Sequence, residues 1–509
     1  MTSPVKSITI VGGGTTGWLA AAFLATRLQT NVAAGEMSIT VVESPNIPII
    51  GVGESLSPAA PETLKSLGIP ERLFMIETDA TFKLAGYFLN WDVGSRGEPT
   101  SWVNPFVGYL TAGNEFERFE LAGKPYGEAP DYAATISPCR AAIEQTRGPR
   151  RIGEADFEAV LRYAYHTDAS RYAALLKKVA LHRGAVHVSD DVVDVTLRGN
   201  GFVDSLQLAE RGSHPVEMVI DATGFSGVIL NKALGIGHVD YSQTLLNDRA
   251  AVIQLDWPEI GEIEPATRAT ALGHGWAFRV PLYHRTGNGY VYSSRFIGDD
   301  EARREFAAHL GDPALAERMR IIPMRVGRAQ RNWVGNCIAM GLSSGFVEPL
   351  EASAIYTVET SLKWLMNYFP NSDFPKALAD RYNQRTAALY DEVVEYIALH
   401  YHLSNREDTA YWRAQRTEPV LPDRLAANLE AWRHTLPVQA DVQPTNYFDQ
   451  NTYLAALFGK GFYKGGQLHP ERKYDPAEWA KLKRTIIDTH DRAVASLPGH
   501  RELLDSFRR

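Results

Sequence analysis

The stretch SITIVGGGTTGWLAAAFLATRL, residues 7–28, decides the fold class of this chain. An apolar, β-branched run leads into Gly12, Gly14 and Gly17, and a segment rich in alanine and leucine follows. This pattern predicts a strand, a tight turn and a helix. A second apolar run then ends at Glu43. A G-x-G-x-x-G turn between a strand and a helix, with an acid ending the next strand, predicts an α/β fold that binds a dinucleotide.

The residues of this turn have separate physical roles in such a site. Gly12 permits the tight turn, Gly14 lets the backbone approach a pyrophosphate, and Gly17 lets the helix pack closely on the strand. The helix N-terminus offers N–H groups and the positive end of its dipole to the phosphates. The acid that ends the second strand can accept hydrogen bonds from a ribose. The candidate cofactor-binding residues of this region are Gly12, Gly14, Thr15, Thr16, Gly17 and Glu43.

Later segments also have patterns that are typical of a nucleotide-binding site. The glycine-rich loop GVGES covers residues 51–55, and the apolar run at 218–221 ends in Asp221, which we expect to order a turn. Residues 335–369 predict a strand, an irregular loop and a long helix. Because such patterns recur in segments far apart in the sequence, they favour a large α/β flavoprotein over a compact NAD domain. They add the candidate cofactor-binding residues Gly51, Gly53, Glu54, Gly341 and Ile355.

The PNSDFP segment at 370–375 favours a domain boundary, and a long amphipathic helix follows it. The pattern predicts an α/β fold with a large FAD-binding domain, similar to flavin monooxygenases, in residues 1–370. A mostly α-helical C-terminal substrate module is expected in residues 371–509. Upstream, residues 154–178 are expected to be helical.

Composition narrows the classes of function. The 509 residues carry a formal net charge of −8 and contain no run rich in lysine and arginine, so neither nucleic acid nor an anionic membrane is the expected partner. Cys139 and Cys337 are the two cysteines, which fits a reducing compartment and excludes a cysteine zinc cluster. No metal site is expected. With no signal peptide or membrane span in the pattern, we expect a cytoplasmic protein.

The stretch TDATFKLAGYFLNW, residues 78–91, contains a lysine in an unusual setting. Alternation predicts a strand that is apolar on both faces, and Lys83 lies within it. A core rarely accepts a lysine unless the ammonium is paired or has a chemical role. A lysine that lies at a sheet edge, with its stem buried and its ammonium in water, is the alternative interpretation.

A series of motifs in the same order resembles the flavin-dependent tryptophan halogenases. The similar stretches span nearly the whole chain: GGGTTGW (12–18), FKLAGYFLNW (82–91), GWAFRVPL (275–282), GFVEPLEASAIY (345–356) and EYIALHYHLSNREDTAYW (395–412). The second stretch matches the one that carries the essential lysine of the family, here Lys83. The fourth matches the one that carries its essential glutamate, here Glu351.

The resemblance implies a two-component enzyme. Reduced FAD, delivered by a separate flavin reductase, and O2 convert a bound halide into hypohalous acid, which reaches an indole-type aromatic through an internal tunnel. Lys83 then hydrogen-bonds the acid or forms a haloamine, and Glu351 helps to position it and takes the ring proton. Analogy with related flavoproteins implies a homodimer.

Two departures from the family pattern concern the halide and the substrate. The signature reads Trp276-Ala-Phe278-Arg-Val280-Pro281, with Phe for the second Trp and Val for Ile. After Glu351, the family's Ser-Thr-Gly is replaced by Ala-Ser-Ala. The N–H groups of Ser353 and Ala354, at a helix start, are the expected halide cradle. Because Ala354 replaces a glycine, both bromide and chloride stay open, with bromide favoured.

An aromatic slot for the substrate is expected from SWVNPFVG (101–108) and PTNYFDQNTY (444–453), with Trp102, Phe106, Tyr447 and Phe448 as its candidate residues. Indole or a larger indole-bearing molecule is as plausible as free tryptophan. Two other functions stay open on the sequence alone. One is a flavin monooxygenase that hydroxylates an aromatic compound, and the other is an FAD-binding protein without catalysis.

Overall fold

The computed structural model describes residues 3–48, 51–94, 96–106, 132–257, 261–442, 445, 447–463 and 476–509. The chain forms two compact units, and each unit is assembled from three segments that are distant in sequence. The first unit comprises Met1–Thr78, Thr167–Tyr241 and Arg325–Asp391. The second comprises Asp79–His166, Ser242–Met324 and Glu392–Arg509. The separation of an FAD-binding domain, 1–370, from a substrate module, 371–509, stays a prediction.

The first unit is built on a six-stranded sheet with the order β20-β21-β12-β1-β2-β8. The central strand β1 (Ser7–Val11) pairs in parallel with β2 (Ser38–Glu43) and with β12 (Met218–Asp221). Four of the five β1 residues are buried, as expected for a parallel sheet that is covered on both faces. Two more strands extend the sheet in parallel, β8 (Val186–Ser189) and β21 (Cys337–Ala339).

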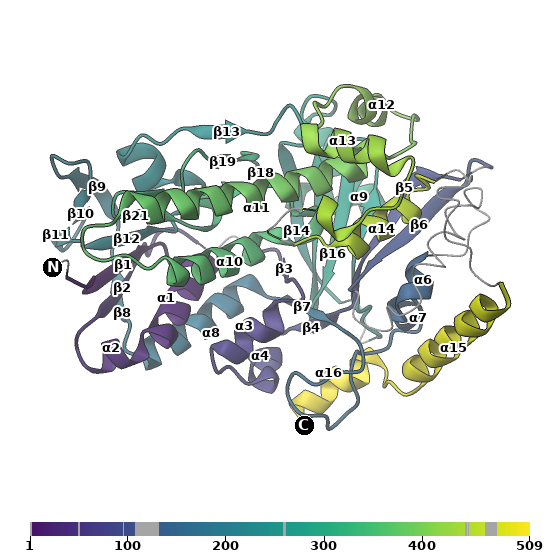
Figure 1. The fold of residues 1–509 in the computed structure, drawn as a ribbon, viewed down its shortest axis with the longest axis horizontal. Helices are drawn as coiled ribbons and strands as arrows, with labels where there is room; N and C mark the ends of the chain where they lie inside the picture. Colours follow the sequence, from purple (N-terminus) through teal and green to yellow (C-terminus); the bar gives the residue numbers. More distant parts are fainter. Residues whose placement is uncertain are drawn as a thin grey trace. The chain divides into compact units, whose positions relative to one another are not determined.

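Helix α1 (Thr15–Arg27) follows β1 directly and packs against β2, α8 (Ala169–His182) and α10 (Ser353–Asn367), as Figure 1 shows. Its alanines and leucines are almost all buried, which explains the apolar composition of this segment. The predicted order of strand, turn, helix and strand is therefore confirmed.

Smaller elements complete the first unit, in which η marks a short 3-10 helix or, for η2, a π-helix. They are α2 (Gln29–Ala33), β3 (Glu54–Ser55), α3 (Ala60–Ser66), α4 (Glu71–Glu77), β9 (Val192–Leu197), β10 (Val203–Leu208), β11 (Gly212–Pro215), η1 (Gly224–Ser226), η2 (Val228–Ala233), β13 (His238–Asp240), β19 (Gly327–Ala329), β20 (Trp333–Val334), η4 (Gly341–Ser343), β22 (Gly345–Phe346), η5 (Pro349–Glu351) and the part of α11 (Lys376–His402) up to Asp391. The long helix predicted after residue 375 is α11.

The second unit is built on a seven-stranded sheet with the order β18-β14-β17-β16-β15-β5-β6. Its neighbours pair antiparallel except β15 and β5, which run parallel. The strands are β5 (Ala85–Val93), β6 (Pro99–Pro105), β14 (Arg249–Asp256), β15 (Ala266–Ala271), β16 (Gly275–Pro281), β17 (Arg285–Tyr292) and β18 (Arg320–Pro323). Helix α9 (Asp299–His309) packs on this sheet, where Phe306 contacts the buried ring of Tyr290 in a cluster that also contains Tyr292.

The remaining elements of the second unit are mostly helical. They are β4 (Thr81–Lys83), α6 (Tyr132–Ile136), α7 (Cys139–Glu144), β7 (Ala164–Thr167), whose last residue belongs to the first unit, η3 (Pro313–Arg318), α12 (Ala410–Thr417), α13 (Asp423–Trp432), η6 (Gln439–Asp441), α14 (Gln450–Gly459), α15 (Pro476–Ala495) and α16 (His500–Arg508). The expectation of a helix throughout 154–178 is wrong, because β7 occupies its middle and α8 begins only at Ala169.

The strand expected to run through 82–91 is interrupted at Leu84 and forms two strands, β4 and β5, in different sheets. The backbone of Leu84 explains the break. Its N–H donates to Pro265 O at 2.8 Å, and its carbonyl accepts from the Phe106 N–H at 3.4 Å. These bonds direct the chain away from β7, which pairs with β4, and into the seven-stranded sheet.

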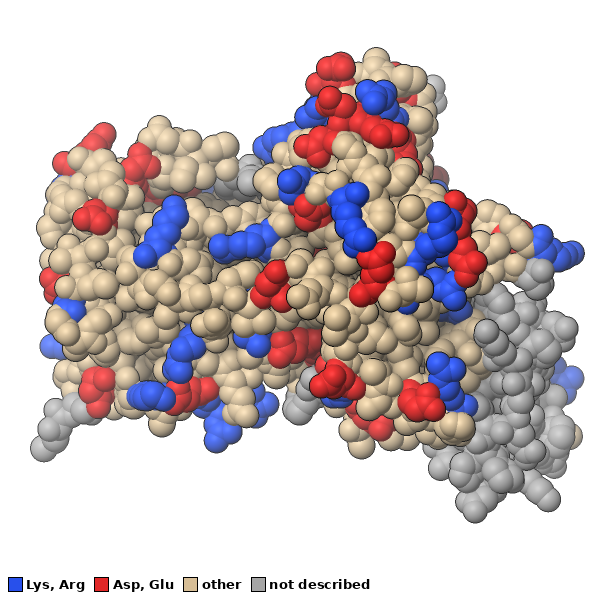
Figure 2. Space-filling model, turned by 90° about the horizontal axis from the view of Figure 1, so that it is seen from above, with Lys and Arg blue, Asp and Glu red and all other residues tan. Residues whose placement is uncertain are grey.

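On the face seen in Figure 2, acidic and basic side chains are interspersed. No helix in the described part of the chain is both long and apolar enough to cross a membrane.

Candidate functional site

The first turn is shaped by glycines that have no room for a side chain. Gly12 has a φ of +119°, and a Cβ there would lie 2.2 Å from Ala222 O. A Cβ on Gly17 would lie 1.8 Å from Gly12 O, so α1 can pack on this turn only with glycine at that position. A Cβ on Gly14, in contrast, would meet no described atom within 4 Å. The backbone at Gly14 is thus open at the N-terminus of α1, which fits the approach of a pyrophosphate.

Glu43 ends β2 beside this turn. A Cβ on Gly13 would lie 2.2 Å from the Glu43 side chain, so the carboxylate is directly at the glycine loop. Lys177 Nζ and His187 Nε2 each lie 2.8 Å from Glu43 Oε2. These two partners fix the carboxylate at the end of the strand, where it can accept hydrogen bonds from a ribose. Sequence reasoning missed both, because Lys177 is 134 residues away and no local pattern links it to Glu43.

The other candidates in the first unit converge on the start of α1 from two sides. Thr15 Oγ1 donates to Ala169 O at 3.3 Å, and a Cβ on Gly51 would lie 3.3 Å from Ala169 Cβ. Gly341, with a φ of +65°, lies so close to Thr16 that a Cβ would be 2.4 Å from its Oγ1. The glycines and threonines predicted from separate segments are thereby brought together.

Three further candidates lie in the same unit. Gly53 has a φ of +136°, and Ile355 is a buried residue in the first turns of α10. Burial raises the pKa of the Glu54 carboxyl to about 7. The turn of Asp221 is as expected, because its carboxylate accepts from the N–H groups of Thr223 and Ile229 at 3.0 Å. Taken with the open backbone at Gly14, this set of residues fits FAD.

Lys83 lies in β4 and is only 6% exposed, so the prediction of a buried lysine is confirmed. Its Nζ lies 5.5 Å from the centroid of the Phe106 ring, a cation–π contact that favours the ammonium form. The structure thus brings together a candidate catalytic residue and a candidate substrate residue. Thr81, two residues before Lys83 and on the same face of the strand, donates to Pro281 O at 2.6 Å.

A neutral histidine lies beside this strand. His166 Nδ1 is 3.2 Å from Thr81 Oγ1, and its Nε2 is 2.8 Å from Thr267 Oγ1. Because the Thr81 hydroxyl donates to a carbonyl, Nδ1 carries the proton in the first contact. Burial, followed by the nearby positive charge of Lys83, lowers the pKa of His166 well below its ordinary value. Sequence reasoning did not find His166, because its segment was expected to be helical.

The remaining substrate candidates have different surroundings. Trp102 is 2% exposed and stacks on Phe88 with ring centroids 4.2 Å apart, which is the environment of a core residue. Phe448 is buried and stacks on Tyr396 at 4.0 Å. Tyr447 is half-buried, with its ring 4.4 Å from that of Phe448. The aromatic slot itself stays a prediction, and parts of the two stretches that suggested it lie outside the described residues.

Glu351 ends the short helix η5 and is half-buried. Ala352 follows with a φ of +53°, a left-handed conformation that alanine rarely adopts, and α10 begins at Ser353. Ser353 is buried and Ala354 is exposed, and within the described chain no side chain caps this helix start. The backbone of Ala352 was not foreseen, since nothing in an alanine signals positive φ. The catalytic role of Glu351 and the halide cradle stay predictions.

The departure at Phe278 has a local explanation. Phe278 on β16 lies opposite Gly289 on β17, and a Cβ on Gly289 would be 2.2 Å from Phe278 Cζ. The phenyl ring therefore covers the glycine of the neighbouring strand. Trp276, the first residue of the signature, is 1% exposed, with ring centroids 6.0 Å from Phe278 and 6.3 Å from Trp91.

Comparisons with known proteins agree with this architecture. A family model described as tryptophan halogenase matches residues 7–472. The 7-chloro-L-tryptophan 6-halogenase of Kutzneria sp. (strain 744) is 34% identical over 517 residues, covering 98% of this chain and 99% of that protein. The tryptophan 7-halogenase of Lentzea aerocolonigenes is 35% identical over 495 residues, covering 91% and 90%. The crystal structure of a tryptophan 6-halogenase from Streptomyces toxytricini has a TM-score of 0.90 and 32% identity, covering 99% of this chain and 100% of that one.

The mixed α/β fold with its C-terminal helical region, together with the similarity to solved flavin-dependent halogenases, places this enzyme in the flavin-dependent halogenase class. The chain belongs to the tryptophan halogenase family. The predicted fold class and the predicted class of enzyme are thereby confirmed.

Proposed function

We propose that this protein uses reduced FAD, O2 and a halide to halogenate a carbon of an indole-type aromatic, with Lys83 directing the halogen. The buried ammonium of Lys83 over the Phe106 ring is the observation that carries the proposal. Bound reduced FAD, delivered by a separate flavin reductase, supplies the electrons with which O2 oxidises the halide to hypohalous acid. The relatives named for tryptophan and 7-chlorotryptophan support an indole-type substrate.

The cation–π contact supports a specific role for Lys83. An ammonium can donate a hydrogen bond to the oxygen of hypohalous acid, which makes the halogen more electrophilic. The ring carbon attacks the halogen, and the carbon–halogen bond forms as the halogen–oxygen bond breaks. The oxygen leaves as water after taking a proton from Lys83. We assign to Glu351 the proton lost from the ring, and solvent exchange restores both groups.

We propose that the N–H groups of Ser353 and Ala354 bind the halide and that bromide is used in preference to chloride. The first turn of α10 supplies N–H donors and the positive end of the helix dipole. The replacement of a family glycine by Ala354 changes the backbone available to the ion, and bromide is the more easily oxidised of the two halides. Competition between equal concentrations of bromide and chloride, with both products quantified, tests this preference.

Product analysis tests the function. The purified protein is mixed with FAD, NADH, a generic flavin reductase and bromide or chloride, and indole, tryptophan and 7-chlorotryptophan are offered. Mass spectrometry is expected to show a bromine isotope pair that is absent without halide. Lys83→Met, which keeps most of the unbranched side chain and removes the charge, should lower product formation at least about 100-fold. Phe106→Leu, which removes only the aromatic face, should lower it less.

A different set of products would contradict the proposed halogenation. Products that gain one oxygen without halide, with an unimpaired Lys83→Met variant, would identify an aromatic monooxygenase. Glu351→Gln, assayed in parallel, should lower the rate of halogenation while NADH consumption continues, because a glutamine cannot accept the ring proton.

A further inference from the structure

We infer that His500, on α16, is a positioning residue for Lys83, holding the backbone of the strand from which the ammonium extends. This inference rests on the proposed function of Lys83. It concerns a residue outside the 7–472 range matched by the family model.

Within the described residues, the strand that carries Lys83 has a neighbouring strand on one of its two edges. Among the strands that the structure describes, β4 pairs with β7 alone, with Phe82 opposite Tyr165 and Lys83 opposite Ala164. On the other edge, the Phe82 N–H donates to His500 Nε2 at 3.1 Å. A buried N–H without an acceptor destabilises the folded state. The imidazole therefore supplies the acceptor that a further strand would provide.

The orientation of the imidazole is fixed on its other side as well. His500 is fully buried, and its Nδ1 lies 2.8 Å from Ile263 O. A carbonyl only accepts, so Nδ1 carries the proton and Nε2 has a free lone pair for Phe82. Only the neutral ring in this tautomer makes both bonds. His500 thus links the strand of Lys83 to the loop before β15.

The rest of α16 attaches to the chain around β4. The Phe507 ring lies 6.0 Å from that of Phe82. Asp505 accepts from the Tyr283 hydroxyl at 2.8 Å, and the Tyr283 N–H donates to Asp79 O at 3.1 Å. These contacts hold the residues on the N-terminal side of β4. The bond from Phe82 to His500 acts on the residue next to Lys83.

Such a contact can affect one step of the reaction and spare another. Lys83 acts on hypohalous acid after it forms, so the oxidation of halide does not depend on the position of the ammonium. A misplacement of about 1 Å in a reacting group can cost about 100-fold in rate. A loosened β4 should therefore let hypohalous acid escape while NADH and O2 are still consumed.

Three variants separate positioning from simple stability. His500→Leu removes the acceptor, whereas the Oε1 of His500→Gln can still accept from Phe82. Leu504→Ala removes a buried side chain of the same helix that makes no hydrogen bond to β4. We expect His500→Leu to lower kcat for halogenation at least about tenfold, with KM unchanged and hypohalous acid trapped in solution. Coupling is the amount of halogenated product formed per hypohalous acid made. His500→Gln should restore most of this coupling, and Leu504→Ala should lower Tm without changing it.

A measurement on the protein without cofactor makes the inference independent of turnover. Hydrogen exchange at the Phe82 amide should be at least about tenfold faster in His500→Leu than in the wild type and close to the wild type in His500→Gln. Equal coupling in His500→Leu and Leu504→Ala, at matched losses of Tm, would overturn the inference. Undiminished product from Lys83→Met would overturn the proposed function instead, whatever the exchange data report about His500.

Discussion

The three glycines of the first turn differ in what an added side chain would touch. Alanine substitutions at Gly17 and Gly14 therefore test folding and cofactor binding separately. In the protein alone, a Cβ on Gly17 would clash with the carbonyl of Gly12, whereas a Cβ on Gly14 would meet open space. Gly17→Ala should therefore weaken folding, with a Tm several degrees lower. Gly14→Ala should fold normally and bind FAD at least about tenfold more weakly, as measured by fluorescence titration, because its methyl group occupies the pyrophosphate approach. Normal FAD affinity in Gly14→Ala would contradict this assignment.

A buried acid gives a prediction for pH. Burial raises the pKa of Glu359 from 4.5 to about 7, with Lys363 and Thr63 acting in the opposite direction. A carboxyl whose pKa is raised in the folded state favours folding fully below its unfolded pKa, and that contribution is lost as pH rises through the folded pKa. The loss between pH 4.5 and 7 amounts to about 3 kcal/mol.

Glu359→Gln should remove this dependence. The variant should match the wild type near pH 4.5 and have a higher Tm above pH 7, as measured by calorimetry across this range. Replacement of the exposed Glu301 on α9 by glutamine provides the control, which should change Tm little at any pH. A constant difference between Glu359→Gln and the wild type would show that burial of the charge is not the cause.

For individual residues, the sequence reveals those with strong local signals and misses the residues that contact them. Lys83 could be predicted as buried because apolar residues flank it on both faces of the strand. His166 and His500 could not, because they contact its strand across 85 and 418 residues of sequence. The positive φ of Ala352 was hidden for another reason, since positive φ is foreseen only where glycine or asparagine stands.

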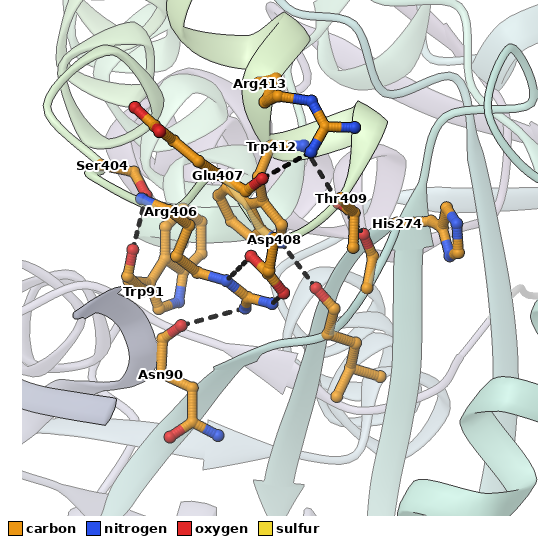
Figure 3. A network of polar contacts seen from close by, with 12 residues as sticks. Asn90, Trp91, His274, Ser404, Arg406, Glu407, Asp408, Thr409, Trp412 and Arg413 are labelled. Carbon is orange, nitrogen blue, oxygen red and sulfur yellow. Dashed lines mark hydrogen bonds and ion pairs between the residues drawn. The ribbon is translucent and has the colours of Figure 1, made fainter. Parts of the chain in front are cut away.

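Among the elements, the segment between α11 and α12 depends on one arginine. Arg406 donates to both oxygens of Asp408, at 3.0 and 2.6 Å, and to Asn90 O at 3.0 Å, and its guanidinium lies 4.7 Å from the Trp412 ring (Figure 3). In the same view, Ser404 Oγ donates to Trp91 O. These contacts attach the segment to β5, the strand that follows Lys83.

Replacing this arginine by lysine should be costly although the charge is kept. Arg406→Lys loses the two-pronged bond to Asp408 and the contact of the guanidinium with the Trp412 ring, so stability should fall by about 1–2 kcal/mol. Arg303→Lys, in an exposed pair with Asp300 on α9, is the matched control and should stay within about 0.5 kcal/mol. Thermal unfolding measures both. Equal shifts for the two variants would mean that the network around Arg406 contributes no more than a surface pair.

Sheets were harder to foresee than helices. The central strands of the first unit and the long α11 have clear periodicity, and both were predicted. The break at Leu84 was not, because it is caused by hydrogen bonds to Pro265 and Phe106 and leaves the apolar alternation intact. The four residues of β7 were assigned to a helix since a short strand within a helix-like composition has too little pattern to be recognised.

For the whole chain, the order of motifs predicts the family and the enzyme class, and the comparisons confirm both. The division into two units, each assembled from three segments, has no counterpart in composition or periodicity. It depends on pairings such as that of β1 with β12, whose residues are more than 200 positions apart. Such contacts are decided by packing, which a single sequence does not display.

The bond between Phe82 and His500 can form only late in the synthesis of the chain. Its two residues are 418 positions apart, so a ribosome working at roughly 5–20 residues per second releases them about 20–80 s apart. In that interval β7 can pair with β4, but the Phe82 amide has no imidazole to bind. Newly made protein thus completes the support of its lysine late in synthesis, and slower translation of the intervening message lengthens the period in which that strand is exposed to mispairing.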